Sequence, residues 1–132
     1  MLVGAGVIIY KDDMILLQKR ADDKCWGKHG GIVEMWENTE DTVRRELSEE
    51  INVRVGKLKL FGVYSGKDYR VEYDNGDVVN YVDVVYTTDE LLDDPTPDNG
   101  ETLECHWFHK DALPEDIHPT DRAPIIEFAK SL

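Results

Sequence analysis

Three glutamates stand close together in the segment 45–50, which reads RELSEE. Glu46, Glu49 and Glu50 are spaced i, i+3 and i+4, so on a helix they project from one side. Like charges at this spacing repel each other and cost stability unless something compensates for them. Mg²⁺ prefers carboxylate oxygens and keeps some of its water ligands, which suits hydrolytic chemistry. The segment therefore predicts a divalent cation site, and the alternative interpretation is a solvated acidic helix face.

The residues around this segment match the spacing of a known signature. The stretch from Gly31 to Val53 resembles the Nudix box of the Nudix (MutT-like) hydrolase family. In that box Gly is followed after five residues by Glu and after seven more by Arg-Glu-aliphatic-any-Glu-Glu-any-Gly-aliphatic. The fixed positions that agree are Gly31, Glu37, Arg45, Glu46, Leu47, Glu49, Glu50 and Val53. So many residues at fixed offsets make the resemblance specific.

Three residues depart from the family pattern. Asn52 replaces a Gly, which is conservative because the residue after a helix often adopts a left-handed conformation that Asn tolerates. His29 replaces the Pro of the upstream Trp-x-x-Pro-Gly-Gly motif, and we interpret it as a surface loop residue. Trp36 stands where a Gly usually precedes the box Glu, and the sequence offers no physical reason for it.

The resemblance implies a fold and an activity. The expected fold is α/β, with a mixed β-sheet sandwiched between α-helices in one domain over residues 1–132. The expected reaction is hydrolysis of the diphosphate linkage in a nucleoside diphosphate derivative or a nucleoside triphosphate. ADP-ribose, nucleoside triphosphates, oxidised nucleotides, sugar nucleotides and dinucleotide polyphosphates all stay open as substrates. A homodimer is a further expectation, since dimers are common in the family.

The resemblance also assigns roles within the box. Glu46, Glu49 and Glu50 are expected to bind Mg²⁺ or Mn²⁺, with the carbonyl of Gly30 as a further ligand. Glu46 is the first choice for the base that activates water. Arg45 is expected to orient the carboxylates by pairing with Glu37, and the alternative is an ordinary helix salt bridge. Gly31 and Glu37 are expected to be structural.

Outside the box, the resemblance suggests substrate-binding residues. Arg20 follows the second predicted strand and is expected to contact a phosphate, although a solvated strand end explains it almost as well. Glu34 matches a carboxylate that lies in or beside the metal site in the family. Glu104, with Glu101, resembles a late Glu of many relatives. The aromatic candidates for stacking on a base, each of which fits a core position equally well, are Trp26, Trp36, Tyr64 and Tyr69.

The periodicity of apolar residues and the positions of turn residues predict which helices, strands and loops carry these site residues. The segment 39–51 is predicted as a helix, capped by Asn38 or Thr39, with an apolar stripe of Val43, Leu47 and Ile51. A second helix is predicted over 119–132. Strands are predicted over 3–10, from 14–17, within 53–64, over 70–73 and 78–87 around an Asn-Gly turn, and over 103–109. The segments 26–31 and 91–101 are predicted as loops.

Composition limits the remaining classes of function. The chain has 132 residues, which suffice for the core of one domain, and a net charge of −13. That charge argues against a nucleic acid polymer as partner, whereas cations could bridge a small phosphorylated substrate to an acidic site. No apolar run approaches the ~20 residues of a membrane helix, and no basic region precedes the first apolar stretch. Cys25 and Cys105 are not spaced as in metal-binding or redox motifs, so we interpret them as reduced thiols, and a disulfide between them is the alternative. Reduced thiols are typical of the cytoplasm, where we therefore expect the protein.

Three hypotheses follow from these observations. The first is a metal-dependent hydrolase of a small nucleotide. The second is a catalytically silent Nudix-fold module that binds a nucleotide, motivated by His29, Trp36 and Asn52. The third is an acidic scaffold that binds cations only incidentally.

Overall fold

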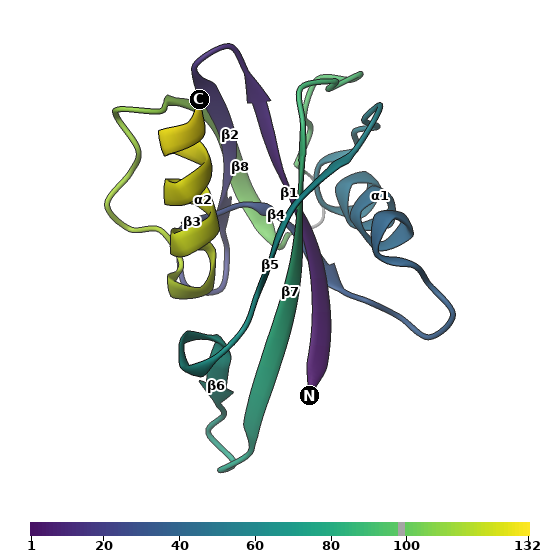
Figure 1. Cartoon of the computed structure of the whole chain (residues 1–132), viewed down its shortest axis with the longest axis vertical. Coiled ribbons are helices and arrows are strands. Elements are labelled where there is room, and N and C mark those ends of the chain that lie inside the picture. The colour runs from purple at the N-terminus through teal and green to yellow at the C-terminus, as the bar shows by residue number, and fades with distance from the viewer. Residues whose placement is uncertain (98–99) are drawn as a thin grey trace.

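The computed structural model describes residues 1–97 and 100–132. A mixed β-sheet lies between two helices, α1 (Thr39–Ile51) and α2 (Pro119–Ser131), which cover opposite faces (Figure 1). The strands are β1 (Leu2–Lys11), β2 (Met14–Arg20), β3 (Trp26–Gly27), β4 (His29–Ile32), β5 (Lys59–Tyr64), β6 (Arg70–Glu72), β7 (Val78–Thr88) and β8 (Thr102–His109). A short 3₁₀ helix, Lys67–Tyr69, precedes β6. The predicted fold class is confirmed.

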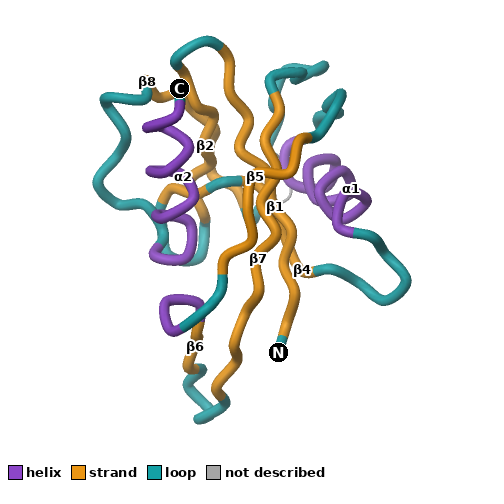
Figure 2. The backbone as a smooth tube through the Cα atoms, in the orientation of Figure 1, coloured by secondary structure: helices purple, strands orange, loops and turns teal. Residues whose placement is uncertain are grey.

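Strand β1 is the centre of the sheet. It pairs in parallel with β7 on one edge and antiparallel with β2 and β4 on the other. A parallel pair requires a long crossover, and α1 lies within the chain that connects β1 to β7. Strand β8 pairs with β2, while β5 and β6 both pair with β7, which extends past β5 toward the end that carries β6 (Figure 2).

Alternation along β1 divides the interior into two cores. Val7 and Ile9 point toward α1, and Ile8 points toward α2, because successive strand residues face opposite sides. The stripe predicted for the first helix is confirmed, since Val43, Leu47 and Ile51 are fully buried. The second helix buries Ile125, Phe128 and Ala129.

Both ends of α1 are capped by asparagine. Asn38 accepts a hydrogen bond from the backbone N–H of Asp41 at 2.8 Å, as an N-cap residue does. Asn52 adopts the left-handed conformation, with φ of 57°, and its N–H donates to the carbonyl of Leu47. The interpretation of Asn52 as a conservative replacement of Gly is confirmed.

The predicted loop 26–31 is wrong, because β3 and most of β4 lie within it. Strand β4 pairs with β1 over Gly4 to Val7, so its alternate side chains face the interior. His29 is one of these and is fully buried, which overturns its interpretation as a surface residue. Burial lowers the pKa of His29 to about 4.

Two strand predictions also need adjustment. The second strand continues to Arg20, so Arg20 is the last residue of this strand rather than a residue that follows it. Within 53–64 only β5 is a strand, and Val55 makes a single bridge with Leu91. The hairpin around Asn75-Gly76 is confirmed by the antiparallel pairing of β6 with β7. In the predicted loop 91–101, residues 98–99 lie outside the described residues.

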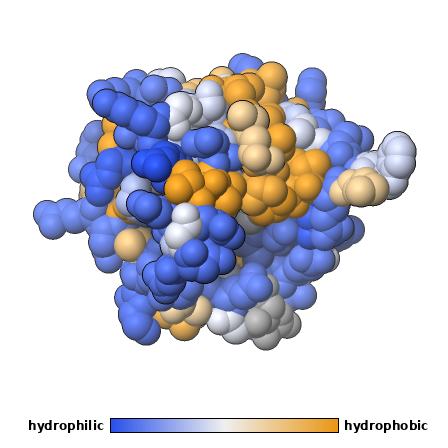
Figure 3. All heavy atoms as spheres, turned by 90° about the horizontal axis from the view of Figure 1, so that it is seen from below, coloured by the Kyte–Doolittle hydropathy of each residue, from blue (hydrophilic) through white to orange (hydrophobic). Residues whose placement is uncertain are grey.

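The face seen from below is largely hydrophilic, and its main apolar area lies toward the centre and right of the view (Figure 3). Leu2, Val3 and Ile32 are exposed apolar residues near the end of the sheet where Gly4 of β1 pairs with Ile32 of β4. Cys25 and Cys105 are free thiols. Within the described residues, neither helix has the length and apolar character needed to cross a bilayer.

Candidate active site

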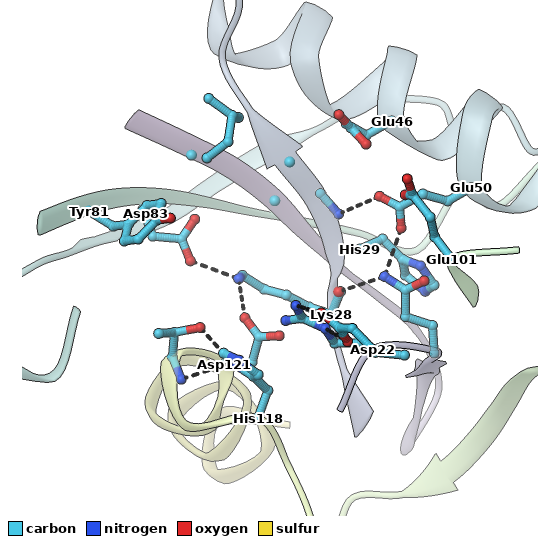
Figure 4. Close-up of a pocket in the computed structure, with 18 of the residues that line it drawn as sticks. Asp22, Lys28, His29, Glu46, Glu50, Tyr81, Asp83, Glu101, His118 and Asp121 are labelled. Atoms are coloured by element: carbon cyan, nitrogen blue, oxygen red, sulfur yellow. Dashed lines mark hydrogen bonds and ion pairs between the residues drawn. The ribbon is translucent and has the colours of Figure 1, made fainter. Parts of the chain in front are cut away.

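A polar cavity of about 1280 Å³ opens beside α1. Glu46 and Glu50 line it from α1, and Gly30 and Gly31 line it from β4 (Figure 4). The register of α1 brings the two carboxylates to the same side, four residues apart, as the sequence predicted for them. Glu49 also lies on α1 but does not line the cavity, and its side chain is 57% exposed.

Gly31 is required by the position of Glu46. A Cβ atom added at residue 31 would clash with the carboxyl group of Glu46. Any larger residue at this position would therefore displace that carboxylate from the cavity wall. This contact supplies the physical reason for the fixed glycine of the motif.

Glu50 is buried and held from two sides. Its Oε2 accepts a hydrogen bond of 2.7 Å from Nε2 of Gln18, and its Oε1 accepts one of 3.4 Å from the N–H of Gly30. Thr102 in turn donates to Oε1 of Gln18. Burial raises the pKa of Glu50 well above its usual range, and the adjacent negative charge of Glu46 raises it further. Sequence patterns did not indicate Gln18, because only the pairing of β2 with its neighbours brings it to the site.

Arg45 connects the box residues to one another. Its Nε lies 2.8 Å from Oε2 of Glu37, and its Nη1 lies 2.9 Å from Oε1 of Glu46. The pairing with Glu37 that the sequence predicted is therefore present. Hydrogen bonds from Arg45 and Thr42 lower the pKa of Glu37 to about 2, so it stays ionised. Arg45 also reaches Glu49 at 3.3 Å.

The donor chemistry of this site fits a hard divalent cation. Two carboxylates, of Glu46 and Glu50, lie beside each other, and Nη1 of Arg45 lies 2.9 Å from Oε1 of Glu46. Oxygen ligands of this kind suit Mg²⁺ or Mn²⁺. No group of three acidic, His or Cys side chains is gathered tightly enough to hold an ion within the described part of the chain. A bound cation would therefore need backbone oxygen, water or substrate as further ligands.

The other predicted substrate-binding residues differ in their placement. Arg20 and Glu34 line the cavity, as does Glu101. The guanidinium of Arg20 is already paired with Asp22, at 2.8 Å, so contact with a phosphate would require it to exchange partners. Glu104 does not line the cavity and instead pairs with His106 at 3.2 Å.

The four aromatic residues predicted as candidates for stacking on a base lie in different environments. Trp26 is buried in the core beneath α2, and Tyr64 packs against the same core. Tyr69 lines the cavity. Trp36 is 98% exposed and has φ of 70°, a conformation that favours glycine. The Gly usual at this family position thus has a backbone explanation, and the Trp side chain packs against nothing in the described structure.

The cavity contains a charged cluster that sequence reasoning missed. Nζ of Lys28 lies 2.7 Å from Oδ2 of Asp83 and 2.6 Å from Oδ1 of Asp121. The Lys28 and Asp121 side chains are almost completely buried and that of Asp83 is 14% exposed. The two carboxylates hold the pKa of Lys28 above its usual range despite burial. Lys28 lies between β3 and β4, Asp83 on β7 and Asp121 on α2, so no local pattern connects them.

The fold and site together define an α/β protein with an acidic helix at the edge of a polar cavity. The family model of the NUDIX domain matches residues 1–128. The chain therefore belongs to the Nudix hydrolase family, as its box indicated.

Curated relatives and solved structures agree with this assignment. An ADP-ribose pyrophosphatase of Methanocaldococcus jannaschii is 31% identical over 116 residues, which cover 86% of this chain and 64% of the relative. A MutT-like protein of Streptomyces ambofaciens is 42% identical over 60 residues, which cover 46% of this chain and 39% of the relative. The chain thus spans less than two thirds of the length of these relatives. The crystal structure of a MutT NUDIX hydrolase from Burkholderia pseudomallei superposes with a TM-score of 0.82, 29% identity and 95% coverage of both chains.

Proposed function

We propose that this chain is a metal-dependent hydrolase that cleaves the diphosphate linkage of a nucleoside diphosphate derivative or a nucleoside triphosphate. The observation that carries the proposal is the pair Glu46 and Glu50, which share one wall of a large polar cavity beside the backbone of Gly30. The Methanocaldococcus relative, an ADP-ribose pyrophosphatase, supports the same class of reaction.

Each residue of the box has a role in this proposal. Glu46, Glu49, Glu50 and the carbonyl of Gly30 are the proposed ligands of Mg²⁺ or Mn²⁺, although Glu49 would have to turn from its exposed position. When bound, the cation neutralises phosphate oxygens and lowers the pKa of its water ligand. Glu46 accepts the proton of the attacking water. Arg45 fixes the Glu46 carboxylate by the 2.9 Å contact, and Arg20 and Glu34 contact the substrate.

The first test is a turnover screen over nucleoside diphosphate derivatives and nucleoside triphosphates, with Mg²⁺, with Mn²⁺ and with chelator, in which chromatography separates the nucleotide products from the substrate. Turnover that needs metal and disappears in Glu46→Gln is the expected result, with Glu40→Gln as control because Glu40 is exposed on the same helix. Unchanged turnover in Glu46→Gln would overturn its role. Folding of each variant is checked by circular dichroism.

A second function is favoured by the incomplete carboxylate cluster. Because no three candidate ligands converge among the described residues, a nucleotide-binding module without turnover is the alternative. Tight nucleotide binding without release of any product over the whole panel would support it. We further propose that residues 1–132 form one domain. We also propose that the protein is cytoplasmic and forms a homodimer. Light scattering of the purified protein would measure its oligomeric state.

A further inference from the structure

The turn that connects β2 to β3 places charged side chains at the cavity. Arg20, Asp22 and Asp23 all line it, and Asp22 lies on the side away from Glu46 (Figure 4). None of these three residues belongs to the proposed metal site. The turn is therefore placed to meet a part of the substrate that lies beyond the bound cation.

Asp22 binds the guanidinium of Arg20 through both carboxylate oxygens. Nε of Arg20 donates to Oδ1 of Asp22 at 3.1 Å, and Nη2 donates to Oδ2 at 2.8 Å. Two parallel hydrogen bonds of this kind make a strong and directional contact. The hydrogen bond from Arg20 lowers the pKa of Asp22 to about 2, so the carboxylate is ionised at neutral pH.

The backbone of the turn holds the two aspartates in place. The N–H of Asp23 donates to Oδ1 of Asp22 at 2.7 Å, and the N–H of Cys25 donates to Oδ1 of Asp23 at 2.9 Å. The N–H of Arg20 donates to the carbonyl of Cys25 at 2.9 Å, which closes the turn. Oδ1 of Asp23 also lies 3.8 Å from Nε of Arg20. Both carboxylates are therefore positioned before a substrate arrives.

The charges of the turn disfavour an anionic group. One guanidinium faces two carboxylates, in a protein whose net charge is −13. A phosphate that took the place of Asp22 on Arg20 would still lie near two negative charges, which repel it. A hydroxyl group, in contrast, can donate to a carboxylate and accept from the guanidinium. The turn therefore suits an uncharged group that carries hydroxyls.

We propose that Asp22 determines which class of substrate the site accepts. It favours a nucleoside diphosphate derivative whose second group is an uncharged sugar, and it disfavours a nucleoside triphosphate, whose terminal phosphate would meet this turn. Specificity often arises from repulsion of the wrong ligand as well as from attraction of the right one. This proposal rests on the proposed function, because the diphosphate of the same ligand would lie at the metal site.

ADP-ribose and adenosine triphosphate are matched probes for this test. Both carry adenosine and a diphosphate, and they differ in the group attached beyond it, which is a ribosyl group or a phosphate. Steady-state kinetics with Mg²⁺ measures kcat/KM for each nucleotide. The wild type should prefer ADP-ribose, and Asp22→Asn should shift the ratio toward adenosine triphosphate by at least ~5-fold, because Asn keeps the shape of Asp and loses its charge.

Asp12→Asn is the control for the change in total charge. Asp12 lies in the turn between β1 and β2 and does not line the cavity, so the ratio should stay at the wild-type value. A wild-type preference for adenosine triphosphate overturns the proposal. An equal ratio in the wild type and in folded Asp22→Asn also overturns it.

Ionic strength separates an effect of charge from a structural disturbance. The side chain of Asp22 is 64% exposed, so salt screens its charge. The difference in ratio between the wild type and Asp22→Asn should therefore decrease at about 1 M salt. A disturbed turn would instead lower kcat/KM for both nucleotides at every salt concentration and would leave their ratio unchanged.

Failure of the proposed function can be recognised separately. If neither nucleotide is hydrolysed, that function fails, and calorimetry with the same nucleotides and Mg²⁺ measures the ratio as affinities. A shift of this ratio in Asp22→Asn keeps the role of Asp22, and no binding of either nucleotide removes it. Hydrolysis of both nucleotides with a ratio that does not depend on Asp22 keeps the function and removes the role.

Discussion

Gln18 donates a 2.7 Å hydrogen bond from Nε2 to Oε2 of Glu50 and so ties β2 to α1 inside the protein. Both residues are buried, and Gln18 also donates to the carbonyl of Lys28 at 3.1 Å and accepts from Thr102. Because its amide is occupied on both sides, Gln18 has one orientation. Gln18 therefore positions a carboxylate of the proposed metal site.

Replacing Gln18 with Leu should weaken metal binding. Groups that orient a ligand typically affect metal affinity by about 10- to 100-fold when they are removed. Titration with Mn²⁺, followed by electron paramagnetic resonance, measures the change. Lys19→Leu is the matched control, since the neighbouring strand residue points to the opposite face. Equal Mn²⁺ affinity in the wild type and Gln18→Leu would show that Glu50 needs no such support.

Adding one methyl group at Gly31 should separate folding from activity. The Cβ would meet the end of the Glu46 side chain, which can move aside, so the fold should persist while the carboxylate leaves its place. We expect Gly31→Ala to lose turnover by about 100-fold, the loss typical of a displaced catalytic group. Gly4→Ala is the control, because its Cβ meets only ordinary contacts beginning at 3.5 Å. Activity of Gly31→Ala equal to that of the control contradicts the prediction.

Arg45 should not be replaceable by Lys. Its guanidinium contacts both oxygens of Glu37, at 2.8 and 3.1 Å, and Glu46 at the same time. An ammonium group has no planar fork and cannot keep these contacts together. Turnover of Arg45→Lys should fall about 10- to 100-fold, with KM changed much less than kcat. A variant with wild-type kcat would indicate that the pair is only a helix salt bridge.

His118 should make part of the stability depend on pH. Its neutral ring accepts a hydrogen bond from the N–H of Thr120 and caps α2. Burial lowers the pKa of His118 below the ordinary 6.5, and the positive charge of Arg20 lowers it further. The negative charges of Asp121, Asp23 and Asp22 raise this pKa, but they do not cancel the decrease. The unfolded chain therefore takes up this proton first as the pH falls, so the free energy of unfolding decreases below about pH 6.5.

Asn is a strong N-cap that does not titrate, so His118→Asn is the matched variant for this effect. Urea unfolding at pH about 7.5 and about 5.5 compares the two proteins. The wild type should lose more stability than His118→Asn over this interval. A larger loss in the variant would reverse the sign of the proposed linkage.

Trp36→Gly should stabilise the protein. The Trp backbone has φ of 70°, and its side chain is 98% exposed, so the strain has little compensating burial. Glycine adopts this conformation without the Cβ penalty, and we expect a gain of about 1 kcal/mol in the free energy of unfolding. Trp36→Ala keeps the Cβ and should show no such gain. A loss of stability in Trp36→Gly would show that the ring has a packing partner.

The local features of the site were readable in the chain itself. Helical periodicity placed Glu46 and Glu50 on one side of α1 and put Val43 and Leu47 on its buried stripe, because both follow from 3.6 residues per turn. The left-handed cap at Asn52 likewise depends on neighbouring residues alone.

Packing between elements that are distant in sequence determined the other features of the site. His29 was misread because its burial comes from the pairing of β4 with β1, and Gln18 and Lys28 gained their roles from partners on other elements. Lys28 and Asp121 are 93 residues apart, so no sequence window contains both. Periodicity sets which side of an element a residue faces, whereas the register and the contacts between elements decide what it meets there.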